Sequence, residues 1–439
     1  MDGGCMVSKH RIDVDVLVVG GGMAGCAAAL AAVRKGARVA LAEKSSYLGG
    51  MATKSQFAEM NGVMKGGGEI YRGIPREIMN LLVEGGGRYM LQVPMSSNPA
   101  IRVDRLRYNP EVLKLLLERL LVDAGVRILL NAPCGAASEE TGAGVEIAIR
   151  DQYNDIALRG SVLVDCTGNA DVAHMLGYAT LKTCTDEIQT ATSVFWLTGA
   201  DLERVGAFVA GDGMAEVVRR GYERGVLKGR ILALTPIPGT SSVAVNATRA
   251  ERVDHESILS TTEAILETHA QIPGLVGYLR ESVEGLERAA LSFVSPELGV
   301  RDSRRIKGRY TLTGADLIEL RAFDDAVAVG GYPIDMHDAK TKGVVWMEVD
   351  GVYGIPYSCM VPQSSGRTVR TIVSGKAVSA DREAFGAIRV IPVVTNMGEA
   401  AGHAAYLSWR DGVPVDRVDV EELKALQEIG RMEACASWR

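Results

Sequence analysis

A glycine-rich turn near the start of the chain constrains the fold more than any other feature. Residues 14–19 form a β-branched, apolar run, and Gly20, Gly22 and Gly25 follow it with the spacing G-x-G-x-x-G. Gly20 permits a sharp turn, Gly22 lets a diphosphate approach the backbone, and Gly25 lets a helix pack closely on a strand. Because the N-terminus of the following helix presents free N–H groups, the pattern predicts a dinucleotide site at this turn.

An acidic residue completes a strand–helix–strand unit after this turn. Small helix-forming residues fill 23–35, and residues 38–42 form a second apolar strand that ends at Glu43, 23 residues after Gly20. A carboxylate at that place can accept hydrogen bonds from the ribose hydroxyls of a nucleotide. Because the strand, the glycines, the helix and the acid agree, we favour a Rossmann-like α/β fold over an unrelated glycine-rich turn.

A charge-free stretch within this unit has the length of a marginal membrane span. Val16 to Val33 is 18 residues without a charge, which is near the lower limit for a helix that crosses a bilayer. However, three consecutive glycines interrupt the stretch, and Asp15 and Arg34 bracket it. We therefore interpret it as strand, turn and helix, and predict no membrane span.

Length, charge and cysteine usage narrow the class of protein further. The chain has 439 residues, enough for about two to three domains. Its net charge of −6 gives no sign of a basic face, so no nucleic-acid partner is expected. The seven cysteines are odd in number, are widely separated and contain no C-x-x-C pair, so neither disulfides nor a metal site is expected. They stand at positions 5, 26, 134, 166, 184, 359 and 435. The polar N-terminus lacks a secretory signal, which favours the cytoplasm.

Two further segments indicate which dinucleotide is bound. Glu43 is followed by a glycine pair within a glycine- and methionine-rich stretch at 47–68, which we interpret as a long loop. Such a loop can lie along an extended cofactor, whereas NAD dehydrogenases usually continue with another compact βαβ unit. A buried strand at 161–164 then ends in an acid, a hydroxyl and a glycine within 165–168, which can return the backbone to the cofactor. Both features favour FAD.

A third segment near the C-terminus supports the same interpretation. A strand at 371–373 ends in a turn at Gly375, and the small residues of 396–405 are interpreted as the start of a helix. The positive end of that helix can face the N1–C2=O2 edge of a flavin, which becomes negative on reduction. Close packing against another helix is the alternative explanation for these small residues.

With these motifs in place, the chain resembles the FAD-dependent oxidoreductase family with the glutathione-reductase-type FAD-binding fold. It is related more distantly to fumarate reductase flavoproteins and thiazole synthases. The matching segments follow the order of the family through nearly the whole chain: Gly20–Gly25 with Glu43, Leu48–Thr53, Gly73–Glu77, Tyr108–Lys114, Asp165–Asp171, Gly299–Tyr310, Gly331–His337, Tyr353–Tyr357 and Ser374–Gly402.

The resemblance implies a Rossmann-like FAD/NAD(P)-binding domain of the three-layer ββα type. This discontinuous FAD domain, at 10–180 and 355–415, would carry an inserted α+β substrate domain at 181–354, followed by a C-terminal helix at 416–439. FAD is expected to bind noncovalently, because no histidine lies between Glu43 and Met60, where fumarate reductase relatives attach flavin. The expected cofactor-binding residues are Gly20, Gly22, Met23, Ala24, Gly25, Glu43, Lys44, Gly49, Gly50, Met51, Ala52, Thr53, Thr167, Gly168, Gly375, Asn396, Met397, Gly398 and Ala401.

Two departures from the family pattern concern the substrate pocket rather than FAD binding. Ala380, Asp381 and Arg382 stand where the family often has a Thr-His pair. Glu399 follows Gly398 where the family frequently has glutamine.

His337 is the first candidate for proton transfer to or from a substrate. It stands near Asp335 in a segment bounded by glycine and proline, which we expect to be a loop. The ordinary pKa of an imidazole suits proton transfer near neutral pH. The alternative is a surface or structural histidine.

Arginines supply the other candidates for the substrate site. Arg301 and Arg305 are expected on one face of a strand, with Arg304 on the other. A guanidinium can hold a carboxylate through two hydrogen bonds or stabilise an anionic flavin. Salt bridges between domains are the alternative role. Arg389 precedes the small-residue helix and is expected to reach the same site.

Together these features predict an FAD-dependent oxidoreductase that transfers a hydride between a small molecule and flavin N5. Because no second glycine-rich nucleotide motif follows a strand, electrons must be exchanged with an external acceptor: oxygen, a quinone, transiently bound nicotinamide or a partner protein. The expected partners are the substrate, this acceptor and, in a homo-oligomer, further copies of the chain. A thiazole-synthase-like biosynthetic enzyme and a non-enzymatic binding protein on a flavoprotein scaffold are the alternatives.

Overall fold

The computed structural model describes residues 8–95, 98–140, 144–151, 153–211, 213–364 and 366–427. Cys5, Cys435 and residues 428–439 of the predicted C-terminal helix lie outside the described residues. Within the predicted C-terminal segment, the structure forms a short helix, α12 (Val420–Leu426).

The main sheet combines a parallel half with an antiparallel extension. Its strand order is β8 (Arg127–Leu129), β2 (Val39–Ala42), β1 (Ser8–Val19), β11 (Asn154–Asp165), β10 (Gly144–Arg150) and β9 (Cys134–Glu140), with β22 (Thr371–Val373) also paired to β11. Strands β8, β2, β1, β11 and β22 run parallel to one another. Strand β10 pairs antiparallel with β11 on one side and with β9 on the other. The strand predicted at 161–164 is the second half of the long strand β11.

The carboxyl ends of the parallel strands meet at one edge of the sheet. Val16 of β1 pairs with Val39 of β2 and with Val162 of β11, and all three side chains are buried. This register brings the ends of β1, β2 and β11 level, so the segments that follow them lie together. In open α/β sheets, ligands bind at that edge.

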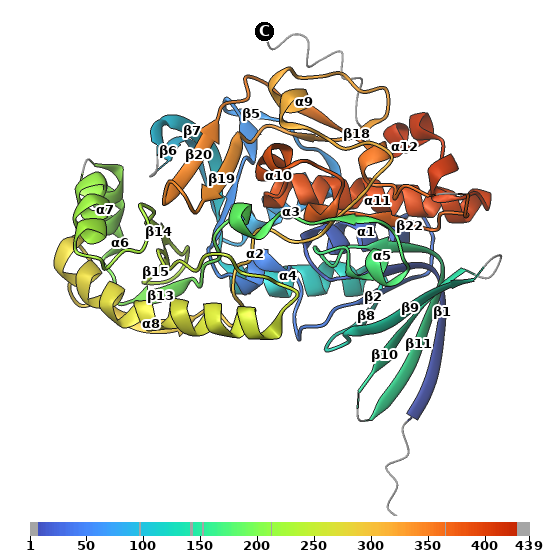
Figure 1. Cartoon of the computed structure of the whole chain (residues 1–439), viewed down its shortest axis with the longest axis horizontal. Helices are drawn as coiled ribbons and strands as arrows, with labels where there is room; N and C mark the ends of the chain where they lie inside the picture. The colour runs from blue at the N-terminus through green and yellow to red at the C-terminus, as the bar shows by residue number, and fades with distance from the viewer. Residues whose placement is uncertain are drawn as a thin grey trace, which may run out of the picture.

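Two long helices pack on each other beside this sheet. Helix α1 (Met23–Arg34) and helix α11 (Ile391–Asp411) both contact β1 and β11, and they lie side by side near the centre of Figure 1. A Cβ at Gly398 would stand 2.2 Å from the carbonyl oxygen of Ala24, and one at Gly402 would stand 2.2 Å from that of Ala28. Glycine therefore sets the close approach of the two helices, as the alternative interpretation of the small residues anticipated.

Residues 47–68 contain more regular structure than the predicted long loop. They include a one-turn helix and short strands that begin a three-stranded sheet, β3–β7–β6, and a hairpin. Two helices, one of them capped by the Asn109 side chain, complete this part of the chain. The elements are α2 (Met51–Lys54), β3 (Glu59–Asn61), β4 (Met64–Lys65), β5 (Gly68–Glu69), α3 (Gly73–Glu84), β6 (Arg88–Met95), β7 (Asn98–Arg107) and α4 (Pro110–Asp123).

A second hydrophobic core forms within the predicted inserted region, at the left of Figure 1. Its antiparallel sheet has the order β14 (Ala233–Pro236), β15 (Ser242–Asn246), β13 (Phe195–Thr198) and β16 (Ala290–Val294), and it is accompanied by α6 (Leu202–Ala210), α7 (Gly213–Glu223) and α8 (Ile258–Ser282). The insertion bounds of 181 and 354 stay a prediction.

Short strands and helices connect this region to the main core. They are α5 (Asp171–Met175), β12 (Thr180–Leu181), β17 (Arg305–Ile306), α9 (Gly314–Ile318), β18 (Ala326–Gly330), β19 (Ile334–Asp338), β20 (Gly343–Met347), β21 (Tyr353–Pro356) and α10 (Arg382–Ile388). Side chains from β18, β19 and β21 belong to the same hydrophobic core as the main sheet. This connection places the predicted catalytic residues of β19 next to the FAD-binding half.

The charge-free stretch at 16–33 has the predicted strand, turn and helix. It forms the end of β1, the glycine turn and most of α1. None of the helices described here is both long and apolar enough to cross a membrane.

Candidate active site

The glycine turn after β1 has the geometry that its sequence requires. Gly20 has φ of +100°, and a Cβ there would stand 2.4 Å from the carbonyl oxygen of Cys166. A Cβ at Gly25 would stand 1.8 Å from the carbonyl oxygen of Gly20. At Gly22, the N-cap of α1, the nearest atom to an added Cβ is Gly50 Cα at 3.8 Å, and no side chain caps the helix. The turn thus leaves space and uncapped N–H groups at Gly22, as an approaching diphosphate requires.

Glu43 lies beside this turn at the end of β2. One carboxylate oxygen accepts the Gly21 N–H at 2.7 Å, and the other accepts the Ser45 N–H at 2.8 Å and lies 3.2 Å from Lys54 Nζ. Because a carboxylate offers about four lone-pair positions, these contacts leave acceptor capacity for a ribose. Lys54, which the sequence analysis missed, also lies 3.1 Å from Glu297.

The segment after Glu43 lies over the glycine turn. The Gly49 N–H donates to the carbonyl oxygen of Gly21 at 2.8 Å, and Gly50, with φ of +54°, lies against Gly22. Ala52 and Thr53 are buried, and the Tyr108 hydroxyl donates to the Ala52 carbonyl oxygen at 2.6 Å. By contrast, Met51 and the nearby Lys44 are exposed. This arrangement places the predicted cofactor residues of 49–53 next to the turn.

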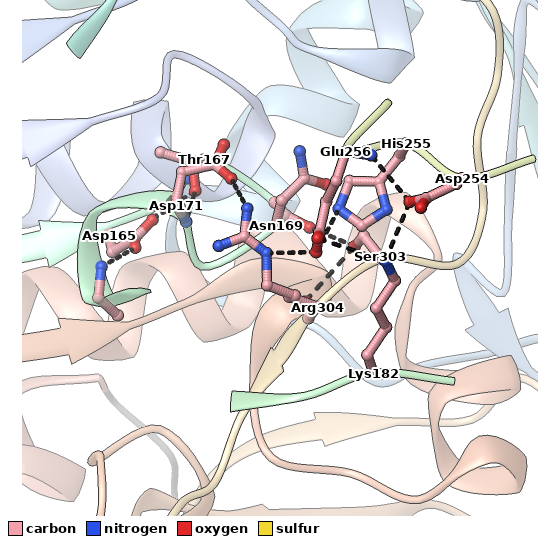
Figure 2. Close-up of polar contacts among 12 residues, drawn as sticks. Asp165, Thr167, Asn169, Asp171, Lys182, Asp254, His255, Glu256, Ser303 and Arg304 are labelled. Atoms are coloured by element: carbon pink, nitrogen blue, oxygen red, sulfur yellow. Dashed lines mark hydrogen bonds and ion pairs between the residues drawn. The ribbon is translucent and has the colours of Figure 1, made fainter. Parts of the chain in front are cut away.

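Beyond β11, a second turn lies at the same edge of the sheet. Buried Asp165 accepts hydrogen bonds from the Thr167 backbone and hydroxyl, at 3.0 and 2.7 Å, and from the Ala173 N–H. Gly168 has φ of +79°, which favours glycine. Asp165 therefore fixes the shape of the turn that carries Thr167 and Gly168 (Figure 2).

Lys376 lies across this second turn, and the sequence analysis missed it. It follows Gly375, which has φ of +84° and lies close to Ala24 of α1. Its amine donates to Asn169 Oδ1 at 3.3 Å and to the Ser303 hydroxyl. Burial lowers the pKa of Lys376 to about 7, and within the described ranges no carboxylate lies within ion-pair distance of this amine.

Arg304 joins the same turn to the inserted region. Figure 2 shows its guanidinium between Asp171 and Glu256, at 3.0 and 2.8 Å. Lys182 continues this network with ion pairs to Asp254 and Glu256, at 3.0 and 3.3 Å. Arg304 thus has the role of a salt bridge between segments that the sequence analysis named as the alternative for these arginines.

The helix start predicted at Asn396 is wrong. Helix α11 begins at Ile391, with Val390 as its N-cap and Pro392 in its first turn. Asn396 lies in the second turn, where its Oδ1 accepts the N–H of Val329 at 2.9 Å. Met397 and Ala401 are fully buried, and Gly398 packs on α1. The helix end available to a cofactor is therefore the segment directly after Arg389, and a contact from Asn396, Met397, Gly398 or Ala401 stays a prediction.

His337 and Asp335 lie on a strand, β19, so the predicted loop is wrong. Alternation along the strand places both side chains on one face, with His337 Nε2 3.5 Å from Asp335 Oδ1. Asp335 also accepts the Tyr332 hydroxyl at 3.1 Å. Burial, together with the charges of Arg301, Arg389 and Arg249, holds the pKa of His337 well below its ordinary value despite the nearby carboxylate. The lowered pKa favours the neutral form of the imidazole.

Two of the predicted arginines join this pair. Arg389 Nη2 lies 3.1 Å from the Asp335 carbonyl oxygen and 3.5 Å from Oδ2 of the same residue. Arg301 Nη1 donates to the carbonyl oxygen of Thr190 at 2.5 Å and lies 3.3 Å from the Thr192 hydroxyl. Burial and the charge of Arg389 lower the pKa of Arg301 to about 9.

Arg305 lies apart from this group. Residues 301–304 form no strand, and β17 contains only Arg305 and Ile306, so the predicted shared face of Arg301 and Arg305 is wrong. The Arg305 guanidinium stacks on the Phe385 ring at 4.9 Å and donates to the Thr183 hydroxyl at 3.1 Å. It supports the packing of α10 rather than contributing to the surroundings of His337.

The His337 group is connected to both predicted cofactor segments. Arg389 directly precedes the N-cap of α11, the helix that packs on α1. On the other side, Thr192 pairs with Gly299, and a Cβ at Gly299 would stand 3.7 Å from Met51 Cε. His337 and the two arginines therefore lie between the predicted cofactor site and the inserted region.

These features define a class of protein: a dinucleotide-binding α/β protein with a buried cluster of His337, Asp335 and arginines close to its predicted cofactor segments. A model of the FAD-dependent oxidoreductase family matches residues 15–427. The chain belongs to this family and is an FAD-dependent oxidoreductase, which confirms the predicted family, Rossmann-like fold class and FAD cofactor. The residues present fit FAD, because Gly22 leaves space at the uncapped end of α1 and Glu43 lies beside it. A search of curated protein sequences found no match.

Solved structures are similar to the chain at low sequence identity. BexE, studied for oxidation during BE-7585A biosynthesis, is 13% identical with a TM-score of 0.50, over 97% of this chain and 67% of its own. A geranylgeranyl bacteriochlorophyll reductase-like protein from Thermoplasma acidophilum is 12% identical, with a TM-score of 0.49 over 98% and 96% of the chains. The p-nitrophenol 4-monooxygenase PnpA from Pseudomonas putida is 11% identical, with a TM-score of 0.49 over 98% and 88%.

Proposed function

We propose that this enzyme transfers a hydride between a small-molecule substrate and bound FAD, with His337 accepting or returning the accompanying proton. FAD would be held noncovalently by the glycine turn, Glu43 and the segment at 49–53, and would supply the two-electron acceptor or donor. The observation that carries the proposal is the buried imidazole of His337, 3.5 Å from Asp335, whose carboxylate lies 3.5 Å from Arg389. This cluster lies between the predicted cofactor segments and the inserted region.

Each side chain of this group has a different role in the proposed reaction. Asp335 orients the His337 imidazole from 3.5 Å and stabilises the charge that forms when the ring accepts a proton. Arg389 holds Asp335 in place through its carbonyl oxygen and its carboxylate. Arg301, fixed by Thr190 and Thr192, supplies positive charge toward an anionic substrate group or a negative charge that develops during the reaction.

The side chains of this group are largely shielded from solvent. The side chain of His337 is only 12% exposed and that of Asp335 only 10%. Tyr332 is buried and donates its hydroxyl to Asp335. Exclusion of water strengthens the electrostatic effect of each charge on the reacting atoms.

An anaerobic reduction screen tests the proposal. The purified holoenzyme is mixed with a panel of hydroxy acids, amino acids and sugars, and the visible flavin absorbance is followed. Photoreduced enzyme is mixed in parallel with unsaturated acids to test the reverse direction. We expect one compound class to bleach or restore the flavin bands with saturation kinetics. If no class changes the flavin in either direction, the proposal of hydride transfer to or from a small molecule is contradicted.

A further inference from the structure

A small pocket opens beside His337 on the side of the inserted region. It is lined by Thr190, Thr192, Gly229, Ile231, Asn246, Ala247, Thr248, Arg249 and His337. We propose that this pocket binds a carboxylate group of the substrate and that Arg249, which no sequence motif indicates, anchors it. This inference rests on the proposed function, because His337 belongs to both sites.

The Arg249 side chain has a buried donor without a hydrogen-bond partner among the described residues. Arg249 is 4% exposed. Its Nε lies 3.1 Å from Glu251, and its Nη2 donates to the Asp338 carbonyl oxygen at 2.7 Å. The remaining nitrogen, Nη1, is buried and has no hydrogen-bond partner in the part of the chain that the structure describes. A buried guanidinium N–H without an acceptor is unfavourable, and a ligand oxygen would relieve it.

Gly229 leaves the space for this unpartnered group. A Cβ at position 229 would stand 2.6 Å from Arg249 Nη1. The Arg249 backbone is fixed by Gln271, which accepts the Arg249 N–H and donates to the Arg249 carbonyl oxygen, at 2.9 and 2.8 Å. The guanidinium is therefore held in place before a ligand arrives, which reduces the entropy lost on binding.

The charge around the pocket favours an anion. The lining contains hydroxyl, amide, imidazole and guanidinium groups and no carboxylate, within the ranges that the structure describes. Arg301 lies next to the pocket through its hydrogen bonds with Thr190 and Thr192, at 2.5 and 3.3 Å. A planar carboxylate matches the planar guanidinium geometry. This match favours a carboxylate over a tetrahedral phosphate.

The position of His337 in the same lining narrows the substrate class. Because Arg249 and His337 line the same pocket, a carboxylate held at Arg249 would bring the carbon next to it toward the imidazole. Bound FAD would supply a two-electron acceptor. For a 2-hydroxy or 2-amino acid, the hydrogen of the C–H bond would leave with its electron pair as hydride, the O–H or N–H proton would go to His337, and a 2-oxo or 2-imino acid would form, so that atoms and charge balance.

Calorimetric titration of the holoenzyme with propionate tests the carboxylate site without turnover. Propionamide serves as the uncharged comparison and inorganic phosphate as the tetrahedral anion. Arg249→Met removes the charge and Arg249→Lys retains it. Arg204→Met is the matched control, because Arg204 is exposed and pairs with Glu287. FAD content and circular dichroism show whether each variant is folded.

We expect propionate to bind wild-type enzyme and Arg204→Met with equal Kd. The Kd should rise on the order of tenfold or more in Arg249→Met and by less in Arg249→Lys. Propionamide should bind much more weakly than propionate. An unchanged Kd in a folded Arg249→Met variant, equal binding of the amide, or tighter binding of phosphate would each overturn the carboxylate assignment.

The reduction screen separates this inference from the proposed function. If a neutral alcohol or sugar reduces the flavin equally well in wild type and Arg249→Met, hydride transfer stands and the carboxylate site is overturned. If propionate binding depends on Arg249 but no compound reduces or reoxidises the flavin, the carboxylate site stands and the proposed function fails.

Discussion

Gly398 of α11 lies directly against Ala24 of α1, so that a Cβ at position 398 would stand 2.2 Å from the Ala24 carbonyl oxygen. Ala24 is the second residue of the helix whose N-terminus follows the glycine turn. The contact therefore fixes the position of that helix end, and with it the predicted diphosphate site, relative to α11. Gly402 and Ala28 repeat the contact one turn further along.

Gly398→Ala should destabilise the enzyme by about 1–3 kcal/mol, because the added methyl group meets backbone that cannot move aside. Gly277→Ala is the matched control, since Gly277 also lies inside a helix and its added Cβ would have no atom within 4 Å. That change should stabilise the protein by up to about 1 kcal/mol. Urea unfolding measures both. Equal effects of the two substitutions would show that the α1–α11 contact is looser than described.

Glu43→Ala should weaken FAD binding by about tenfold or more. The carboxylate lies beside the turn and has acceptor capacity for the ribose, and hydrogen bonds to a charged group contribute about 1.5–3 kcal/mol. Glu297→Gln is the control, because Glu297 pairs with the same Lys54 but is 38% exposed. Titration of apoenzyme with FAD, followed by flavin fluorescence, gives both Kd values. If the two variants bind FAD equally, Glu43 has no role in holding the nucleotide.

His337 should remain an active base at unusually low pH. Its pKa lies well below the ordinary 6.5, so the neutral form persists as pH falls through 6.5, and flavin reduction by a non-titrating substrate should stay constant there. Below pH 6.5 the imidazole binds a proton in the unfolded chain but not in the folded protein. The free energy of unfolding should therefore decrease as the pH falls through this range. Urea unfolding at two pH values should show a smaller loss in His337→Gln. A rate that halves near 6.5 would contradict this account.

Lys376 should destabilise the apoenzyme at neutral and lower pH. Its folded pKa of about 7 lies below the ordinary 10.5, so the unfolded chain binds more protons between these values, and stability rises with pH across them. Lys376→Met should therefore raise Tm relative to wild type most at pH 6, with the difference shrinking toward pH 10. Lys307→Met, at an exposed lysine, is the control. A Tm difference independent of pH would contradict the lowered pKa.

The FAD-binding half of the fold could be predicted because its signals are local. The strand, the glycine spacing and Glu43 lie within 30 residues, and each residue type has a steric or hydrogen-bonding reason that the structure reproduces. The start of α11 also had a local signal in Pro392, which suits the first turn of a helix. The prediction instead placed the helix start at the small residues of 396–402, which in the structure pack against α1.

The substrate side depends on contacts between distant segments. Arg301 bonds Thr190 and Arg305 stacks on Phe385, so partners far along the chain, rather than strand alternation, decide where each guanidinium lies. Arg249 has no motif around it, and its significance emerges only where β15, β19 and the segment at 190–192 meet. Lys376 directly follows Gly375, a predicted cofactor-binding residue. A lysine at this place in the sequence could therefore have been recognised as a candidate site residue.

The most direct test of the central claim is the anaerobic rate of flavin reduction in His337→Gln, measured by rapid mixing with the best substrate of the screen. The variant should contain as much FAD as wild type, because His337 forms hydrogen bonds and an ion pair with Gln189, Thr190 and Asp335, which are not predicted cofactor-binding residues. Its reduction rate should fall by about 10²–10⁴-fold, the usual contribution of a positioned proton acceptor. Reduction at the wild-type rate in an FAD-loaded variant would contradict the assignment of this site.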